Sequence, residues 1–451
     1  MKRLLLLFII CFSLPVLAGS ASGQIFQTVQ INSSPNPVGS GARAQGMGGA
    51  FIGVADDATA ASWNPGGLMQ LERPEVSFVF SYAHRRKDFD SDPHPEAGGL
   101  YERHRDDLNY FSVAYPFMAF DKNMVISLNY QRLYDFYSAL DFNFNYSGFM
   151  SDGSFFDAKT HTRYRQTGAI KAFSPAFAIQ LTPQISVGVT FNFWTDELGY
   201  DNEWEINRTT SGTAVINTIF GSQLNWNLNS FYHEKNDNFE AFNMNFGFLW
   251  DITRILTIGA VFKTPFTADV DRETYTYSTA IPGGFPKPAV SPFLQRESIE
   301  IDFPMSYGLG IALRLSDQLT VAADIYRTHW SDFWVKSRAG SSSPITGNAR
   351  RESHVKDTTQ IRIGCEYLLV LEKTLVPLRF GAFYDPEPSE KHPEDFFGIT
   401  LGTGAMLGNV IIDCAYIYRW GRDVNGAVIG IPSTKADVDQ HELFISMIYH
   451  F

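Results

Sequence analysis

The chain has 451 residues, of which 44% are hydrophobic, 15% are aromatic and 19% are charged. Its formal net charge of −12 lacks the basic excess with which proteins bind nucleic-acid phosphates, so we expect no nucleic-acid partner. Beyond the amino-terminal apolar run the sequence has no stretch of about 18 apolar residues, which excludes a bundle of membrane-spanning helices.

The first residues predict a secretory signal peptide. Lys2 and Arg3 are followed by an apolar run over 4–17 and by small residues at 18–21. A basic start, a short apolar run and small residues before a cleavage point are the features of such a peptide. We therefore expect residues 1–23 to be removed and the protein to be exported.

Residues 24–73 predict a compact plug, or hatch. They do not alternate between apolar and polar residues, and they carry a glycine-rich run at 39–50. Glycine lets one backbone approach another closely, as a filled lumen requires. A dinucleotide-binding loop is rejected, because Pro35 and Pro37 block the strand that should precede it. The residues expected to shape the hatch are Gly41, Arg43, Gly48, Gly49, Asn64, Pro65, Gly66 and Gly67.

From 74 to 451 the dominant pattern is an alternation of apolar residues with small or polar ones. Over 186–193, for example, valine and phenylalanine occupy every second position. This is the period of a strand with two different faces. We expect an all-β fold, a transmembrane outer-membrane β-barrel of about 14 antiparallel strands with the hatch inside its lumen. The segments lie near 75–84, 108–117, 123–134, 168–181, 184–196, 240–250, 254–265, 296–314, 318–331, 356–370, 375–384, 394–404, 409–420 and 440–451.

The connections between these segments alternate in length. Those at 182–183 and 315–317 are short, whereas those at 197–239 and 266–295 are long and mostly polar. Short periplasmic turns and long outer loops are typical of outer-membrane barrels. A soluble β-sandwich is the alternative, but it would carry mixed loop lengths at both ends.

Two of the long connections contain apolar residues that loops in water ordinarily avoid. They are Ile216, Phe220 and Trp226 in the first, and Ile281, Phe285, Phe293 and Leu294 in the second. Ligand sites are mostly apolar concavities, so these residues predict a capture site for a hydrophobic small molecule at the barrel mouth. The alternative is that the two loops pack on each other as a lid.

Strand parity places five charged residues in the lumen, because a charge facing lipid near mid-bilayer costs about 2–4 kcal/mol for arginine. They are Asp324, Arg362, Glu366, Arg379 and Asp413. The short connection at 371–374 makes 356–370 and 375–384 a hairpin, with Glu366 directly opposite Arg379. Arg362 or Arg379 could bind the carboxylate of a fatty acid, although such charges commonly pair across a lumen.

The last segment predicts how the barrel is assembled. Its apolar residues share one face and end on an aromatic, which resembles the signal read by the barrel-assembly machinery. We expect that machinery, outer-membrane lipid and lipopolysaccharide as partners, and the outer membrane as the location. The residues are Leu443, Ile445, Met447, Tyr449 and Phe451.

The sequence carries no pattern that indicates an enzyme, a metal site or a cofactor, which leaves an enzyme as a minor third hypothesis. Phosphate-binding loops, nucleophile elbows and spaced zinc ligands are all missing. Three aspartates over 88–92 resemble the start of a calcium loop, but Pro93 stands where the turn glycine belongs. After cleavage only Cys365 and Cys414 remain, too few for a disulfide framework.

Four motifs of the amino-terminal region carry a family resemblance: Gly41-Ala42-Arg43-Ala44, Gly46-Met47-Gly48-Gly49-Ala50, Ala55-Asp56-Asp57-Ala58 and Trp63-Asn64-Pro65-Gly66-Gly67-Leu68. In these motifs the sequence resembles the FadL/TodX family of outer-membrane hydrocarbon and fatty-acid transporters. The resemblance implies a fourteen-stranded barrel closed by a hatch, passive uptake of fatty acids or aromatic hydrocarbons, and a sideways exit through the wall. Family hatches typically show Asn-Pro-Ala, whereas this chain has Asn64-Pro65-Gly66-Gly67. The glycine-rich hatch is also similar to PorV-type proteins, shuttle or attachment factors of a protein-secretion system, which is the alternative function.

Overall fold

The computed structural model describes residues 39–92, 94–284, 292–372, 374–425 and 434–451. The predicted signal peptide and Phe285 lie outside these ranges. None of the helices in the described ranges has the length and apolarity needed to span a membrane.

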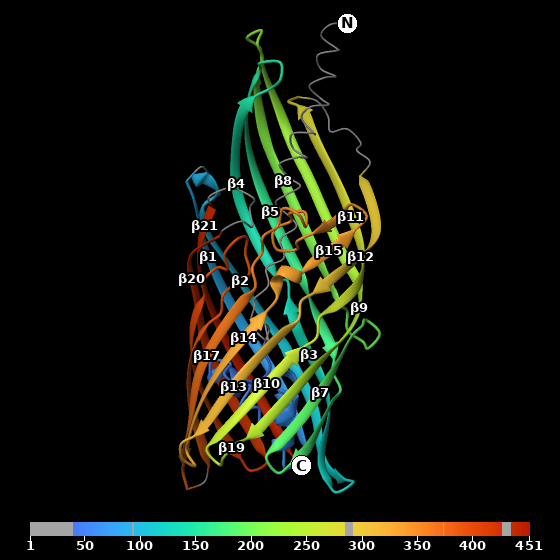
Figure 1. Cartoon of the computed structure of the whole chain (residues 1–451). Helices are drawn as coiled ribbons and strands as arrows, with labels where there is room; N and C mark the ends of the chain where they lie inside the picture. The colour runs from blue at the N-terminus through green and yellow to red at the C-terminus, as the bar shows by residue number, and fades with distance from the viewer. Residues whose placement is uncertain (1–38, 93, 285–291, 373, 426–433) are drawn as a thin grey trace.

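The described residues form one antiparallel sheet of 21 strands that closes on itself (Figure 1). β1 pairs along its length with β2 on one side and with the last strand, β21, on the other. The sheet therefore forms a closed wall. The strands are β1 Glu75–Ser91, β2 Gly99–Ala119, β3 Lys122–Asp135, β4 Ser138–Phe149, β5 Phe155–Phe173, β6 Ala176–Thr182, β7 Ile185–Trp194, β8 Glu203–Asn217, β9 Gln223–Asp251, β10 Leu256–Lys263, β11 Phe266–Pro282, β12 Phe293–Phe303, β13 Ser306–Arg314, β14 Leu319–Thr328, β15 Trp334–Ser337, β16 Gly340–Ser342, β17 Thr358–Val370, β18 Leu375–Tyr384, β19 Phe397–Leu407, β20 Val410–Asn425 and β21 Thr434–His450.

Several strands lie end to end in the wall. β9 pairs with both β7 and β8 on one side and with both β10 and β11 on the other. β3 pairs in the same way with β5 and β6. The number of strands in the barrel depends on how such bent strands are counted, so the expected fourteen stays a prediction.

The two faces of the wall differ as alternation predicts. On β17, Ile361 and Ile363 are exposed whereas Arg362 between them is buried, and on β18 Leu378 and Phe380 flank the buried Arg379. A belt of large exposed apolar side chains is what lipid would cover. The expected hairpin register is confirmed, since Glu366 pairs with Arg379 across β17 and β18.

The sequence prediction of long outer loops is wrong for most of the residues concerned. They form strands instead. The connection expected over 197–239 is largely β8 and β9, and that over 266–295 is largely β11 and β12. These strands rise beyond the rest of the wall, at the end opposite to the carboxyl terminus in Figure 1. The alternation of apolar and polar residues did not predict these parts of the strands. Their outward positions carry Thr, Asn and Ser, because they face no lipid there.

Residues 39–71, here named the amino-terminal segment, lie inside the wall near the end with the short turns (Figure 1, blue). The segment contains α2 Ala42–Gly46, α3 Ala60–Trp63 and the 3-10 helix η1 Pro65–Gln70. α2 contacts β18 to β21, and η1 contacts β3, β6, β7 and β9, so the segment touches opposite parts of the wall. All of its alanines except Ala42, together with Phe51 and Trp63, are buried in one apolar core with wall residues such as Ala114.

Candidate functional site

The amino-terminal segment meets the wall backbone against backbone. A Cβ atom on Gly381 of β18 would lie 2.2 Å from the Gly48 nitrogen, and one on Gly188 of β7 would lie 2.3 Å from the Pro65 carbonyl oxygen. Gly48 also has a φ of +69°, which favours glycine. The wall glycines therefore make room for the segment at positions where any side chain would collide with its main chain.

Wall side chains also hydrogen-bond to the segment's main chain. Thr400 Oγ1 accepts from the Gly48 N–H at 3.0 Å and donates to the Gly46 carbonyl at 2.8 Å. Arg362 Nη1 donates to the Gly48 carbonyl at 2.9 Å. Asp324 Oδ2 accepts from the Phe51 and Ile52 N–H groups at 2.7 and 2.8 Å. These contacts satisfy buried main-chain groups of a segment that is mostly not helical.

A buried ion network joins the segment to the wall. Arg43 binds Asp56 within the segment at 2.5 Å and Glu366 of β17 at 2.9 Å. Arg379 binds the same Glu366 and also Asp413, each at 2.6 Å. The two arginines thus face three carboxylates in a place where an unpaired charge would be costly.

Both arginines that were expected to bind a ligand carboxylate are occupied by groups of the chain itself. Arg379 is bound by Glu366 and Asp413, as described above. Arg362 donates to Gly48, lies 3.4 Å from an Asp385 oxygen and stacks over Phe383, with its guanidinium carbon 4.8 Å from the ring centre. Both guanidinium groups are thus engaged within the chain, and binding of a ligand carboxylate by them stays a prediction.

A second charged cluster joins the connection after β18 to β1 and β20. Glu387, in the connection that follows β18, binds Arg419 at 2.8 Å and Arg85 at 3.3 Å. Burial opposes ionisation of Glu387, but the two guanidinium groups outweigh it and lower the pKa of this carboxyl to about 2. The connection is therefore held to the wall by charge.

The apolar residues expected to form one mouth patch are divided by the structure. Ile216 and Trp226 are buried on β8 and β9 beside Ala158 and Ala214, and Ile281 of β11 is buried as well. Phe220 is 75% exposed at the tip of the β8–β9 hairpin, and Phe293 and Leu294 at the start of β12 are 63% and 48% exposed. Phe285 lies outside the described residues. Three of the seven thus remain accessible from water.

Deeper in the lumen lies a large group of aromatic side chains, here named the lumen aromatic cluster. Its rings pack closely: Phe303 is 4.6 Å from Phe266 and 5.2 Å from Phe333 between ring centres, and Phe266 is 5.3 Å from Trp194. The cluster is supplied by strands on one side of the lumen and by the connection after β14. Its aromatic members include Phe136, Trp194, Trp204, Phe239, Phe266, Phe303, Trp330 and Phe333.

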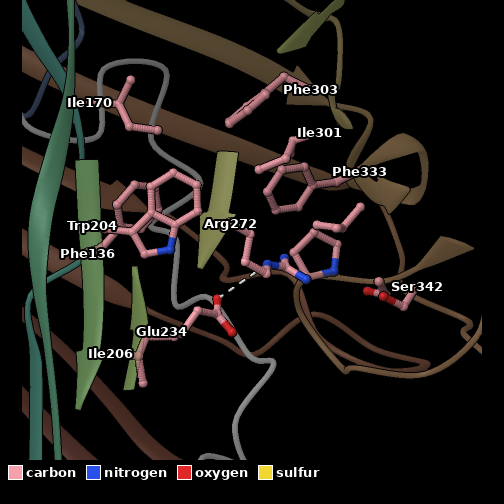
Figure 2. Close-up of a pocket in the computed structure, with 13 residues that line it drawn as sticks. Phe136, Ile170, Trp204, Ile206, Glu234, Arg272, Ile301, Phe303, Phe333 and Ser342 are labelled. Atoms are coloured by element: carbon pink, nitrogen blue, oxygen red, sulfur yellow. Dashed lines mark ion pairs between the residues drawn. The ribbon is translucent and has the colours of Figure 1, made fainter. Parts of the chain in front are cut away.

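The outer pocket opens beside this cluster, with an empty volume of about 670 Å³ that includes open solvent. Figure 2 shows rings and aliphatic side chains converging on it, with Arg272 beside Glu234. The Arg272 Nε lies 3.7 Å from a Glu234 oxygen, and its Nη1 lies 3.7 Å from Glu297. The cation of this pocket is therefore already paired. The lining residues are Phe136, Ile170, Trp204, Ile206, Glu234, Arg272, Ile301, Phe303, Phe333, Val335, Ser342, Ser343 and Pro344.

The inner pocket, with an empty volume of about 560 Å³, is lined by other members of the same cluster, nearer to the short turns. One of its lining residues, Tyr326, packs with Ile52 of the amino-terminal segment, which places the segment beneath it. Half of its lining is polar. The lining residues are Leu133, Tyr134, Asn192, Trp194, Asn243, Asn245, Lys263, Thr264, Phe266, Pro304, Ser306, Tyr326, Thr328 and Trp330.

The connection between β14 and β17 was missed as part of the site. It contains the 3-10 helix η3 Trp330–Asp332 and the short strands β15 and β16, and it brings Trp330 and Phe333 into the aromatic cluster. The signal was present in the sequence, because three aromatic residues fall within 330–334 of a connection expected to be polar.

Comparison with known proteins identifies relatives of this arrangement. The family model described as outer membrane protein transport protein (OMPP1/FadL/TodX) matches residues 34–428. A Pseudomonas aeruginosa FadL homologue superposes with a TM-score of 0.55 at 15% identity, covering 94% of this chain and 98% of the homologue. No curated relative matches the sequence.

Two further solved structures are similar in fold. The Pseudomonas putida toluene transporter TodX gives a TM-score of 0.54 at 14% identity, covering 92% of this chain and 98% of the transporter. The CymD monoaromatic hydrocarbon channel gives a TM-score of 0.51 at 14% identity, with 92% and 98% covered. At such identities the likeness shows the fold alone.

Proposed function

The chain belongs to the outer-membrane transport family OMPP1/FadL/TodX, and on that premise we propose that it takes up hydrophobic small molecules across the bacterial outer membrane. The family is one of transporters rather than enzymes. The observation that carries the proposal is the lumen aromatic cluster, since buried rings around two pockets are the kind of site that binds an apolar ligand.

The ligand enters from the water side in this proposal. Phe220, Phe293 and Leu294 are exposed at or near the outer ends of their strands and make the first apolar contact. The outer pocket then takes the ligand deeper. Replacing Phe293 and Leu294 by Ser should slow uptake without affecting folding, because both side chains are already in water. Unchanged uptake at normal expression would remove these residues from the site.

The amino-terminal segment acts as the hatch in this proposal. Its support is the set of contacts with opposite parts of the wall and the backbone-to-backbone packing at the wall glycines. Deleting residues 24–70 should raise single-channel conductance in planar bilayers, because the lumen would lose its filling. A deletion variant with the parent's conductance would show that the segment does not close the channel.

A sideways exit is supported by a seam in the wall. The ladder between β2 and β3 stops at the pair Tyr110 and Gln131, and the described part of β2 beyond it pairs only with β1. Ion pairs replace the ladder there: Arg105 binds Asp135, and Arg132 binds Asp107. Two strands held by side-chain ion pairs separate more readily than two strands held by a ladder of main-chain hydrogen bonds. We therefore propose this seam as the exit.

The proposed function is tested by replacing Phe333 with Ser, because Phe333 is buried in the aromatic cluster but lies on a connection rather than on a barrel strand. Uptake of radiolabelled toluene and of dodecanoate into vesicles should fall strongly in this variant. Phe149→Ser, at an exposed position at the end of β4, is the matched control and should keep the parent rate. Equal uptake rates in the two variants would refute uptake through the cluster. If Phe333→Ser instead reduced protein secretion in cells without changing uptake, the alternative function as a secretion shuttle would be favoured.

A further inference from the structure

The turn between β2 and β3 carries an exposed aromatic side chain on a strained backbone. Phe120 and Asp121 form this two-residue turn with φ angles of +52° and +57°, a conformation that favours glycine and asparagine. The Phe120 side chain is 92% exposed, so packing within the chain does little to offset the strain. A bulky ring in such a place indicates a contact outside the chain.

Further short turns at this end of the wall also carry large exposed apolar side chains, although turns in water are ordinarily made of polar and small residues. These residues lie at or beside the turns that follow β9, β13, β17 and β19, and the last residue of β21's end is exposed as well. Together they are here named the turn ring: Phe120, Ile255, Leu315, Leu371, Leu407 and Phe451.

The length of the apolar stretch on β21 indicates how deep the turn ring lies. The outward side chains are apolar from Phe451 up to Leu443, and His441 and Asp439 follow on the same face. At about 3.3 Å per residue and a tilt near 40°, the stretch from Phe451 to His441 rises by about 25 Å, the full height of the apolar band of such barrels. If the turns stood in water, the band would have to include Asp439 and its partner Arg422, and charges are unfavourable in hydrocarbon.

β14, on another part of the wall, shows the same pattern. Leu315 precedes this strand, Val321 and Ile325 share its outward face, and Arg327 is the first charged residue on that face. Arg327 binds Asp357 at 3.1 Å. The first outward charge thus stands as far above the turn ring on β14 as on β21.

We infer that the turn ring is inserted in the periplasmic leaflet of the outer membrane, at the boundary between lipid head groups and acyl chains. Large apolar and aromatic side chains are stable at this boundary, and Phe120 gains there the apolar contact that it lacks within the chain. The inference concerns the depth of the barrel in the membrane and does not depend on the identity of the ligand.

A phospholipid leaflet fits the turn ring better than a periplasmic protein does. A protein partner would cover one sector of the rim, whereas the ring runs from the β2–β3 turn to the end of β21 and continues the exposed apolar belt of the wall. Strand addition is also disfavoured at the β2–β3 hairpin. Below Ala114, β2 pairs only with β3 in the described structure, and Pro116 in that stretch lacks the N–H that a partner strand would use.

The inferred depth also sets the level of the amino-terminal segment. The Ser186 hydroxyl, near the start of β7, donates to the Gly66 carbonyl at 2.8 Å. The lower end of the segment therefore lies just inside the turns. With the turn ring in the leaflet, this end is level with the lipid head groups and does not stand in open periplasm.

The test places the environment-sensitive fluorophore NBD on single cysteines of the full-length mature protein, after Cys365→Ala and Cys414→Ala have removed the native thiols. The labelled variants are Phe120→Cys, Leu315→Cys and Leu407→Cys, in nanodiscs that contain phospholipid and no other protein. NBD emission at all three positions should be shifted to the blue, quenched by lipids brominated near the head group, and protected from iodide in the water.

The matched control is Phe149→Cys, an exposed aromatic position at the end of β4 and far from the short turns. Its label should be open to iodide and insensitive to brominated lipid, and the folded band on gels shows that each labelled variant is a barrel. Labels at the turns that behave like the control would overturn the inference. So would lipid contact at Phe120 alone, because the ring would then not be inserted. Labels that are open to iodide until a periplasmic extract is added would assign the ring to a protein partner instead.

Discussion

A single methyl group on a wall glycine should loosen the contact between the amino-terminal segment and the wall. In Gly381→Ala the new Cβ would lie 2.2 Å from the Gly48 nitrogen, 2.5 Å from the Met47 carbonyl carbon and 2.6 Å from the Gly48 Cα. All three are main-chain atoms, so no flexible side chain can move aside. To reach the 3.4 Å of an ordinary contact, the segment must retreat from β18.

The retreat has a calculable cost. It breaks or stretches the hydrogen bonds of Gly48 with Thr400 and Arg362, which measure 3.0 and 2.9 Å. With a net value of about 1 kcal/mol for each bond and about 1–3 kcal/mol for overpacking, we expect a destabilisation of roughly 3–5 kcal/mol. The cost falls on the contact between segment and wall rather than on the ladder of the barrel.

The assay is single-channel conductance in planar bilayers, combined with the temperature at which the folded band disappears on gels. Channels of the Gly381→Ala variant should switch transiently to a higher conductance than those of the parent. The folded band of the variant should disappear at a lower temperature than that of the parent. Gly148→Ala on β4 is the control, because its nearest atom would be 3.3 Å away on the ring of Phe156, which can move. Parent-like conductance and stability in Gly381→Ala would refute the backbone-to-backbone account of the segment.

Other perturbations should separate the charged contacts by their burial. Arg379→Gln leaves Glu366 without one of its partners and should lower the free energy of unfolding, measured with denaturant in lipid vesicles, by about 3–5 kcal/mol. Arg163→Gln, in an exposed ion pair, should lower it by under about 1 kcal/mol. Equal losses in the two variants would show that burial of the ion pair does not matter. The pKa of Glu387 is lowered to about 2, so its stabilising effect is complete above the ordinary pKa near 4.5 and is lost as the pH falls toward 2. Protease cleavage of the connection at 385–396 should therefore rise over that range, and Glu387→Gln should remove the pH dependence. Deleting Phe451 should lower the yield of heat-modifiable barrel in outer-membrane fractions, and a normal yield would contradict the assembly role of the terminal aromatic.

The wall could be predicted from the sequence because each lipid-facing position must be apolar. The alternation of apolar and polar residues is therefore visible in each membrane-spanning strand on its own. The same constraint gave the hairpin register of Glu366 and Arg379, which the structure confirms. The strand extensions were missed for the complementary reason. Beyond the bilayer, outward positions such as Thr209 and Ser211 of β8 carry no apolar signal, and their pairing with β5 and β9 shows them to be strand.

The candidate site could be predicted only in part. The alternation along each strand predicted which charged residues face the lumen. It did not predict their partners in the amino-terminal segment, such as Arg43, because these lie over 300 residues away in sequence. The pockets draw single residues from many strands, and neither Lys263 nor Trp330 carries a local pattern that marks it. What could have been noticed is the aromatic run at 330–334 in a connection of otherwise polar residues.

The height of one side of the wall has a consequence for where a ligand first meets the protein. β9 has 29 residues, which at about 3.3 Å per residue and a tilt near 40° gives a rise of roughly 70 Å. The apolar band of such barrels is only about 25 Å tall. The taller strands therefore extend well beyond the apolar band, and Phe220 lies exposed at the tip of the β8–β9 hairpin. A hydrophobic ligand captured there, as proposed above, would meet the protein before it meets the membrane surface.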